Sequence, residues 1–377
     1  MLIGVVAETD PLETRVAASP ETVKKFIALG AEFAVQHGAG ASAGVSDAEF
    51  EAAGARMASA GDVLSGVDVL LKVRRPSGVE LTQIRRGALV VAMMDPYGHI
   101  PAIEAMAKAG VDAFAMELLP RITRAQVMDV LSSQANLAGY RAVIDAASEY
   151  GRALPMMMTP AGTVPAAKVF VMGVGVAGLQ AIATARRLGA VVTATDVRPA
   201  TKEQVESLGA KFVAVEDEEF KQAETAGGYA KEMSPEYRAK QAALVAAHIA
   251  RQDIVVTTAL IPGRPAPRLV TAEMAQSMRR GSVIVDLAVE RGGNCELATA
   301  GELVTTAGGV KIVGYSSVTR LAATASSLYS RNLYAFVETL IDKASKALAV
   351  KWDDELVKAT CLTRDGAIVN PNFQPKA

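Results

Sequence analysis

The chain has 377 residues, enough for roughly two domains of about 150 residues each. Hydrophobic residues make up 50% and charged residues 21%, a balance typical of folded globular proteins and not of disordered chains. The 39 basic and 40 acidic residues leave a net charge of −1, which argues against a protein that holds nucleic acid through phosphate contacts. Two cysteines and three histidines are too few for a disulfide framework, a zinc cage or a histidine-rich metal site. We therefore expect no metal site and no nucleic-acid partner.

The N-terminus shows no targeting segment. MLIGVVAETD lacks the positive n-region and the long apolar run of a signal peptide. The most apolar stretch, residues 169–185, contains three glycines and Gln180, so a strand, a turn and a helix explain it better than a membrane span. We expect a soluble intracellular chain with no spanning segment.

The first third of the chain alternates short apolar runs with helical patterns. A helix is expected to begin after Ser19, with Pro20 in its first turn. This alternation is typical of βαβ units and predicts a parallel sheet covered by helices on both faces. The strands are expected at residues 1–7, 33–36, 67–73 and 88–94.

Two long helical patterns divide the chain, at residues 124–150 and 319–350. Between them, a loop at 159–162 precedes a second alternating unit. We predict an α/β fold of two Rossmann-like, doubly wound parallel sheets bridged by the two long helices. The first domain would be discontinuous, residues 1–133 and 320–377, and the second would comprise residues 134–319. The polar tail after Lys358 is expected to be loosely ordered. The strands of the second unit are expected at 168–172, 191–196, 211–214, 254–258, 282–286 and 311–313.

A glycine-rich turn follows the first strand of the second unit. Gly173, Gly175 and Gly178 stand in the pattern G-x-G-x-x-G, a helical stretch follows, and the next strand ends at Asp196. Gly173 permits the tight turn, Gly175 lets the backbone approach a pyrophosphate, and Gly178 lets helix and strand pack closely. The helix N-terminus supplies N–H donors for the phosphates. The motif predicts a dinucleotide-binding domain; the alternative is a glycine-rich turn without a ligand.

Asp196 and Arg198 bear on the choice of dinucleotide. The carboxylate of Asp196 is expected to accept hydrogen bonds from the adenosine ribose and to repel a 2′-phosphate, which favours NAD(H) over NADP(H). Arg198, two residues on, could instead accommodate that phosphate, or it could pack along the adenine. We expect NAD(H).

Six segments together resemble one known family. They are residues 121–140 (RITRAQVMDVLSSQANLAGY), GVGVAGLQAIATARRLGA, TDVRPATKEQVESLGAKF, ETAGGYAKEM, TTALIPGRPAP and VIVDLAVERGGNCEL. In these segments, and from Arg15 to about Leu333, the chain closely resembles the NAD(H)-binding component of proton-translocating nicotinamide nucleotide transhydrogenase. It is more distantly similar to alanine dehydrogenase, which shares the two-domain fold.

The resemblance implies partners. In that family this component is a homodimer that passes hydride to a separate NADP(H)-binding subunit, which sits on a proton-conducting membrane subunit. We therefore expect NAD(H) on this chain and NADP(H) only on the partner subunit. The chain would be cytoplasmic and peripheral, held on the cytoplasmic face of the inner membrane by separate membrane subunits.

Hydride transfer between two nicotinamides needs no protein base, so the protein must position the rings and exclude water. Arg121, Gln126, Asp129 and Ser132 are suited to hold a carboxamide and ribose near the ring. On one helix the last three would share a broad polar face. Helix geometry alone prefers Ser133, whereas the family resemblance points to Ser132. The alternative is a solvated helix face with an ordinary Arg121–Asp129 ion pair.

Further contacts to the cofactor are expected from loops. Gly228 and Tyr229 lie in a polar glycine-containing segment that resembles the family's mobile loop over NAD(H). Val176 is expected to contact the cofactor through its backbone. Leu260 belongs to one of two segments, 257–262 and 286–290, that follow strands and so lie at the carboxyl edge of the sheet.

Two other functions are compatible with the motifs. A soluble alanine dehydrogenase would use Arg15 and Lys72 to hold a substrate carboxylate. That family also uses a histidine after the strand at 88–94, where His99 comes about five residues late, and an aspartate where this chain has Glu290. If the chain is instead a transhydrogenase component, Arg15 and Lys72 would be remnants that serve ion pairs or packing. A non-catalytic NAD-binding module is the third possibility, against which the residues from Arg121 to Ser132 argue.

Overall fold

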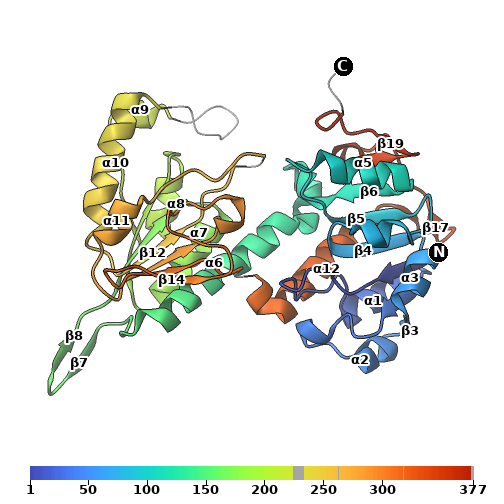
Figure 1. Ribbon diagram of the computed structural model, residues 1–377, viewed down its shortest axis with the longest axis horizontal. Helices are drawn as coiled ribbons and strands as arrows, with labels where there is room; N and C mark the ends of the chain where they lie inside the picture. The colour runs from blue at the N-terminus through green and yellow to red at the C-terminus, as the bar shows by residue number, and fades with distance from the viewer. Residues whose placement is uncertain (224–232, 262, 317, 375–377) are drawn as a thin grey trace. The chain divides into compact units, whose positions relative to one another are not determined.

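A computed structural model describes residues 1–223, 233–261, 263–316 and 318–374. The chain divides into two compact units, Met1–Gln134 with Thr319–Ala377, and Ala135–Val318 (Figure 1). Helix α6 (Val130–Tyr150) runs from the first unit into the second, whereas α12 (Ala322–Glu338) lies within the first.

The first unit is built on an eight-stranded sheet in the order β19-β18-β6-β5-β4-β1-β2-β3. The pairs from β3 to β6 are parallel, and β18 and β19 extend the sheet in antiparallel fashion. The strands are β1 (Leu2–Val5), β2 (Glu32–Gln36), β3 (Arg56–Ala58), β4 (Val69–Arg74), β5 (Leu89–Met93), β6 (Asp112–Ala115), β18 (Cys361–Arg364) and β19 (Ala367–Ile368). The α-helices are α1 (Pro20–Ala28), α2 (Asp47–Ala52), α3 (Ala60–Gly66), α4 (Gly78–Leu81), α5 (Ile100–Ala109), α12 and α13 (Glu355–Thr360).

The predicted start of the first helix is confirmed. Ser19 caps α1, with its hydroxyl accepting from the Thr22 N–H at 3.3 Å, and Pro20 occupies the first turn. Proline fits there because that N–H has no helical partner in any case. Replacing such a cap by alanine typically costs about 1 kcal/mol.

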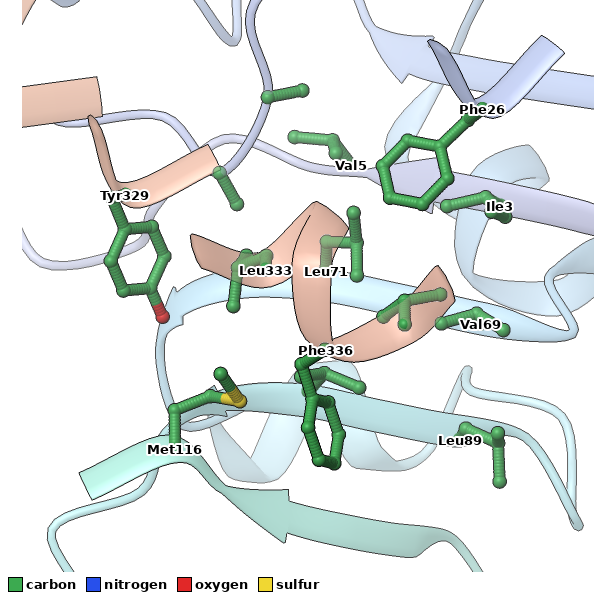
Figure 2. Close-up of a cluster of buried hydrophobic side chains, with 14 of the residues drawn as sticks. Ile3, Val5, Phe26, Val69, Leu71, Leu89, Met116, Tyr329, Leu333 and Phe336 are labelled. Atoms are coloured by element: carbon green, nitrogen blue, oxygen red, sulfur yellow. The ribbon is translucent and has the colours of Figure 1, made fainter. Parts of the chain in front are cut away.

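Helix α12 fills the core on one face of this sheet. Tyr329, Leu333 and Phe336 are fully buried and belong to one hydrophobic cluster with Leu71 of β4 and Leu89 of β5 (Figure 2). Burying one such large side chain contributes roughly 1.5–3 kcal/mol. A segment from the end of the chain therefore completes the core that the first strands begin.

The second unit has a seven-stranded sheet in the order β11-β10-β9-β12-β13-β15-β14. The first six are parallel, and in order of appearance in the chain their arrangement is 3-2-1-4-5-6, the doubly wound Rossmann order. The predicted α/β class with two Rossmann-like parallel sheets is confirmed, but the prediction of two bridging helices is wrong for the second, because α12 lies entirely within the first unit. The strands are β9 (Lys168–Met172), β10 (Val191–Thr195), β11 (Lys211–Phe212), β12 (Ile254–Thr257), β13 (Val283–Asp286), β14 (Leu303–Thr305) and β15 (Lys311–Val313). The α-helices besides α6 are α7 (Val176–Arg187), α8 (Thr201–Ser207), α9 (Glu218–Lys221), α10 (Pro235–Ile249) and α11 (Ala272–Gln276).

The loop expected at 159–162 is the tip of a hairpin, β7 (Met157–Thr159) with β8 (Gly162–Val164), which projects from the second unit's sheet (Figure 1). The antiparallel strand β14 was not predicted. The strand has only three residues, too few to show the alternation of apolar and polar side chains that distinguishes a strand from a loop.

Both long helices are shorter than predicted. Residues 123–128 form a 3-10 helix, η3 (Thr123–Met128), and α6 begins only at Val130, because Asp129 leaves the helical region with ψ 92°. Helix α12 ends at Glu338 and is followed by the hairpin β16 (Ile341–Asp342) and β17 (Ala347–Leu348). The carboxylate of Asp342 accepts from the Ser345 N–H at 2.9 Å and fixes that turn.

The expectation of a loosely ordered tail is wrong as far as residue 374. Strands β18 and β19 pair beyond β6, and the red C-terminal segment lies beside β6 in Figure 1. Phe373 is buried and contacts Tyr97 edge to face. The polar composition was misleading because polar residues of this segment are themselves buried and hydrogen-bonded: Thr363 Oγ1 donates to the Val111 carbonyl at 2.8 Å, and Asn370 Nδ2 donates to the Ala359 carbonyl at 3.1 Å. Across the described ranges, no helix is both long and apolar enough to span a membrane.

Candidate nucleotide-binding site

The glycine turn after β9 can be built only from glycines at two of its three positions. Gly173 has φ +101°, and a Cβ there would lie 2.6 Å from Thr258 Oγ1. A Cβ on Gly178 would lie 1.9 Å from the carbonyl oxygen of Gly173, so this glycine permits the close contact of helix and turn. A Cβ on Gly175 would meet nothing within 4 Å. Internal packing therefore does not require glycine at position 175, and its exposed backbone is open to a ligand.

Helix α7 begins at this turn without a capping side chain. Gly175 is its N-cap, and Val176, the first helical residue, is 39% exposed. The N–H groups of a first helical turn have no partners within the helix and attract anionic groups. The turn therefore fits the pyrophosphate of a dinucleotide, through backbone groups from Gly175 onward.

The carboxylate of Asp196 is bound by four donors. Oδ2 accepts from the Val174 N–H at 2.7 Å and from Arg198 Nη2 at 3.0 Å. Oδ1 accepts from the Arg198 N–H and from Arg198 Nε, both at 2.9 Å. The side chains of Arg198 and Asp196 are 32% and 7% exposed. Asp196 thus ties the glycine turn to the end of β10, and it is paired with Arg198, a contact that sequence reasoning missed.

A second contact at the turn comes from α6. A Cβ on Gly139 would lie 2.0 Å from the carbonyl oxygen of Ala177, so only glycine lets α6 lie this close to the start of α7. Asn136, one turn earlier, donates to Gln180 Oε1 at 3.3 Å. Gly139 was given no role from the sequence; a glycine inside a long helical pattern is the available signal, because it costs helix stability unless something packs there.

Leu260 lies in the loop after β12 and is 52% exposed. The buried side chain of Asn294 holds that loop: Nδ2 donates to the carbonyls of Ala259 and Pro267, and Oδ1 accepts from the Ala259 N–H. Asn294 was not assigned a role from the sequence. The segment containing Gly228 and Tyr229 lies outside the described residues, so the expected loop over the cofactor stays a prediction.

Asp129 and Ser132 are in direct contact at the start of α6. Asp129 Oδ1 accepts from the Ser132 N–H at 2.9 Å, and Ser132 Oγ donates to Asp129 Oδ2 at 2.6 Å. The Asp129 carbonyl accepts from the Ser133 N–H at 3.2 Å, so Asp129 occupies the N-cap position. The serine that contacts Asp129 with its side chain is Ser132, whereas Ser133 Oγ donates to Asn332 Oδ1 at 2.7 Å.

The predicted single helical face for these residues is wrong. Gln126 is exposed on η3, before the corner at Asp129, and its carbonyl accepts from the Asp129 N–H at 3.4 Å. Arg121 is exposed and precedes η3; within the part of the chain that the structure describes, it makes no ion pair with Asp129. The change of direction at Asp129 was not predicted, because Asp129 ends the 3-10 helix η3 and also caps the α-helix α6.

Arg15 and Lys72 are engaged by carboxylates of the same chain. Arg15 Nη2 lies 2.7 Å from Glu13 Oε2, and Lys72 Nζ lies 2.7 Å from Glu80 Oε1 and 3.4 Å from Glu8 Oε2. Burial opposes ionisation of Glu13, but the Arg15 guanidinium outweighs it and holds the pKa of that carboxyl below its usual value. Burial raises the pKa of Glu8 although Lys72 opposes the rise.

Two sequence families match almost the whole chain. The alanine dehydrogenase/PNT N-terminal domain matches residues 4–138, and the alanine dehydrogenase/PNT C-terminal domain matches residues 142–371. The chain is 57% identical, over 98% of both chains, to the first part of the NAD(P) transhydrogenase alpha subunit of Rhodospirillum rubrum. It is 30% identical to alanine dehydrogenase of Mycobacterium tuberculosis, over 78% of this chain and 74% of that one. The crystal structure of transhydrogenase from Sinorhizobium meliloti superposes with a TM-score of 0.90 at 62% identity, covering 98% of this chain and 100% of that one.

The doubly wound sheet with its glycine turn is an NAD-binding, Rossmann-like fold, and the matches to dehydrogenase and transhydrogenase sequences place the chain among the oxidoreductases. The chain belongs to the alanine dehydrogenase/PNT family and, within it, to the NAD(P) transhydrogenase alpha subunits. The resemblance noted from the sequence motifs is confirmed.

Proposed function

We propose that this chain is the NAD(H)-binding subunit of a proton-translocating transhydrogenase. Bound NADH would supply a hydride directly to NADP⁺ on a separate subunit, and separate membrane subunits would couple the transfer to proton movement. The chain would then lie on the cytoplasmic face of the inner membrane, held there by those subunits. The observation that carries this proposal is the 57% identity over 98% of both chains to a named transhydrogenase alpha subunit.

The residues at the start of α6 suit the positioning that such a transfer needs. Asp129 and Ser132 brace each other and the helix start, so neither side chain needs to be ordered anew when a ligand binds. Gln126 is exposed and offers an amide that can pair with a carboxamide. We propose these residues, together with Arg121, as the ones that hold the nicotinamide half.

The hairpin β7–β8 supports the homodimer. Met156, Met157 and Met158 are 57%, 42% and 79% exposed. An isolated two-stranded hairpin is marginally stable in water, and an apolar one gains stability when another surface covers it. We infer that a second copy of the chain covers it. Sedimentation should give a dimer for the wild type and a weaker one for Met158→Lys, whereas Leu12→Lys, at an exposed position of the first unit, should leave the dimer intact. A monomeric wild type would contradict the inference.

Amino-acid oxidation is the second candidate, favoured by the 30% identity to an alanine dehydrogenase. The side chains that would have to hold its substrate are engaged elsewhere. Arg15 is bound by Glu13 and Gln134, and Lys72 is fully buried between two glutamates. His99 donates from Nδ1 to the Asp95 carbonyl at 2.9 Å at the start of α5.

The test compares the chain alone with the chain plus an NADP⁺-loaded NADP(H)-binding subunit of the family, by stopped-flow absorbance of NADH, which is consumed in hydride transfer and formed from NAD⁺ in alanine oxidation. We expect NADH binding by the chain alone, no oxidation of alanine, and hydride transfer only when the partner is added. Turnover of the chain alone with any small amino or hydroxy acid would contradict the proposal and support the dehydrogenase.

A further inference from the structure

The Arg198 side chain occupies half of the acceptor capacity of Asp196. A carboxylate offers about four acceptor positions, and four donors reach this one. Two of them are backbone N–H groups, of Val174 and of Arg198 itself. The other two, Nε and Nη2, belong to the Arg198 guanidinium and approach one oxygen each, in the bidentate geometry that gives strong pairs.

A bound dinucleotide would need the two acceptor positions on the Asp196 carboxylate that Arg198 Nε and Nη2 now occupy. In this fold the acid at the end of the second strand accepts from the adenosine ribose, which has two hydroxyl donors. We propose, on the basis of the NAD(H)-binding function above, that Arg198 competes with the nucleotide for Asp196 and lowers its affinity. Ribose binding would exchange two guanidinium donors for two hydroxyls and would give up the 3.3 Å bond from Arg198 Nη2 to the Val174 carbonyl, while the Val174 N–H stays on Oδ2 and keeps the glycine turn tied to Asp196.

The exposure of the pair makes this exchange feasible. Arg198 is 32% exposed, so its guanidinium can return to water, whereas Asp196 at 7% cannot. Because the guanidinium is partly exposed, solvent competes for it and the pair is weaker than its bidentate geometry alone would make it. The competition therefore weakens binding without blocking it. Changes in affinity of this kind fall mostly on the dissociation rate, which suits a subunit whose nucleotide must leave after each transfer.

The same pair affects the choice between NADH and NADPH. While Arg198 is paired, its positive charge offsets the carboxylate that would repel a 2′-phosphate. Without the guanidinium, Asp196 carries an uncompensated charge next to that position. Arg198 is thus expected to reduce the discrimination between the two cofactors as well as the affinity for the preferred one.

The experiment is a fluorescence titration of the full chain with NADH and with NADPH. Arg198→Met should lower the Kd for NADH by roughly tenfold, which corresponds to about 1.4 kcal/mol, and should not strengthen NADPH binding. Arg198→Lys should lie between, because an ammonium still pairs with the carboxylate but not in bidentate fashion. Arg187→Met removes an exposed arginine from the last turn of α7 and should leave both constants unchanged.

A double-mutant cycle ties the effect to the pair. In an Asp196→Ala background, Arg198→Met should no longer strengthen NADH binding. Unchanged or weaker NADH binding by Arg198→Met, or an equal gain in both backgrounds, would overturn the inference while leaving the proposed function intact. A folded wild type that binds neither nucleotide would overturn both. Thermal unfolding of each variant checks that the chain remains folded.

Discussion

Asn332 accepts a hydrogen bond from the hydroxyl of Ser133 at 2.7 Å, although the two residues are 199 positions apart in the chain. The same side chain donates from Nδ2 to the Val127 carbonyl at 2.8 Å. One buried amide from α12 therefore joins the end of η3 to the start of α6, on either side of Asp129. The corner that carries Gln126, Asp129 and Ser132 is thus held from outside as well as by its own capping contacts.

We predict that Asn332→Ala lowers the free energy of unfolding by about 1–3 kcal/mol, because the Val127 carbonyl and the Ser133 hydroxyl lose a buried partner. In the reconstituted complex it should also slow hydride transfer more than it weakens NADH binding, since the nicotinamide half would be less well positioned. Chemical denaturation and stopped-flow kinetics measure the two effects. Asn372→Ala, at an exposed position, is the matched control. Wild-type stability in Asn332→Ala would contradict the role of the clamp.

Gln126 and Asp129 give a second prediction. Gln126→Ala should lower the rate of hydride transfer by up to about 100-fold, the effect of misplacing a reacting group by ~1 Å. Its NADH affinity should change much less, because the adenosine and pyrophosphate half supplies most of the binding. For Asp129 the informative change is Asp129→Asn, which keeps an oxygen for the Ser132 N–H and so keeps the helix cap. If rate and affinity fall in parallel, these residues hold the cofactor without orienting it.

The second unit was predicted well because its signals are local. An apolar strand, three glycines and an acid at the next strand end are read from a short stretch of chain, and Gly173 and Gly178 stand where the turn requires glycine. The corner at Asp129 was predicted poorly. Its shape depends on whether a side-chain oxygen of Asp129 caps α6, and on Asn332, which no local pattern connects to it.

Asp196 shows a second limit of prediction from sequence, which concerns contacts between side chains. From the sequence we predict that Asp196 binds the ribose and that Arg198 complicates the cofactor choice. Whether a charged neighbour two positions on contacts the acid or turns away depends on side-chain rotamers, which a sequence pattern does not encode. The bidentate contact between the two therefore became visible only in the structure.

His248 gives a prediction about pH. Burial lowers the pKa of His248, and the nearby charges of Arg251, Lys211 and Lys168 lower it further. The imidazole ring lies against Phe170, and its Nε2 is 2.9 Å from Thr193 Oγ1. As the pH falls below about 6.5, the unfolded chain takes up a proton at this histidine before the folded chain does. Stability that is fully present above that pH is then lost.

The measurement is the free energy of unfolding between pH 7.5 and 5. The buried carboxyls of Glu8 and Glu117 have raised pKa values and act in the opposite direction, so the test is the difference between two proteins. On acidification the free energy of unfolding of the wild type should fall relative to that of His248→Gln, because the uncharged amide does not titrate. The carboxyl of Glu13, with its lowered pKa, affects stability only at more acidic pH. His37→Gln, at an exposed histidine, is the control. Equal pH slopes for the wild type and His248→Gln would show that His248 does not cause the loss.

Gly139 tests the contact between α6 and the start of α7. A methyl group there would lie 2.0 Å from the Ala177 carbonyl oxygen, a backbone atom that cannot rotate away, so the two helices must separate. Gly139→Ala should therefore destabilise the chain by roughly 1–3 kcal/mol, the usual cost of overpacking, despite the better helix propensity of alanine. Because Ala177 belongs to the first turn of α7, whose N–H groups face the expected pyrophosphate, NADH affinity should fall as well. Gly61→Ala in α3 is the matched control, since its methyl would meet only Gln83 Oε1 at 3.7 Å and should be neutral or stabilising. If Gly139→Ala is as stable as Gly61→Ala and binds NADH normally, the close approach of α6 is not required for the turn to hold its shape.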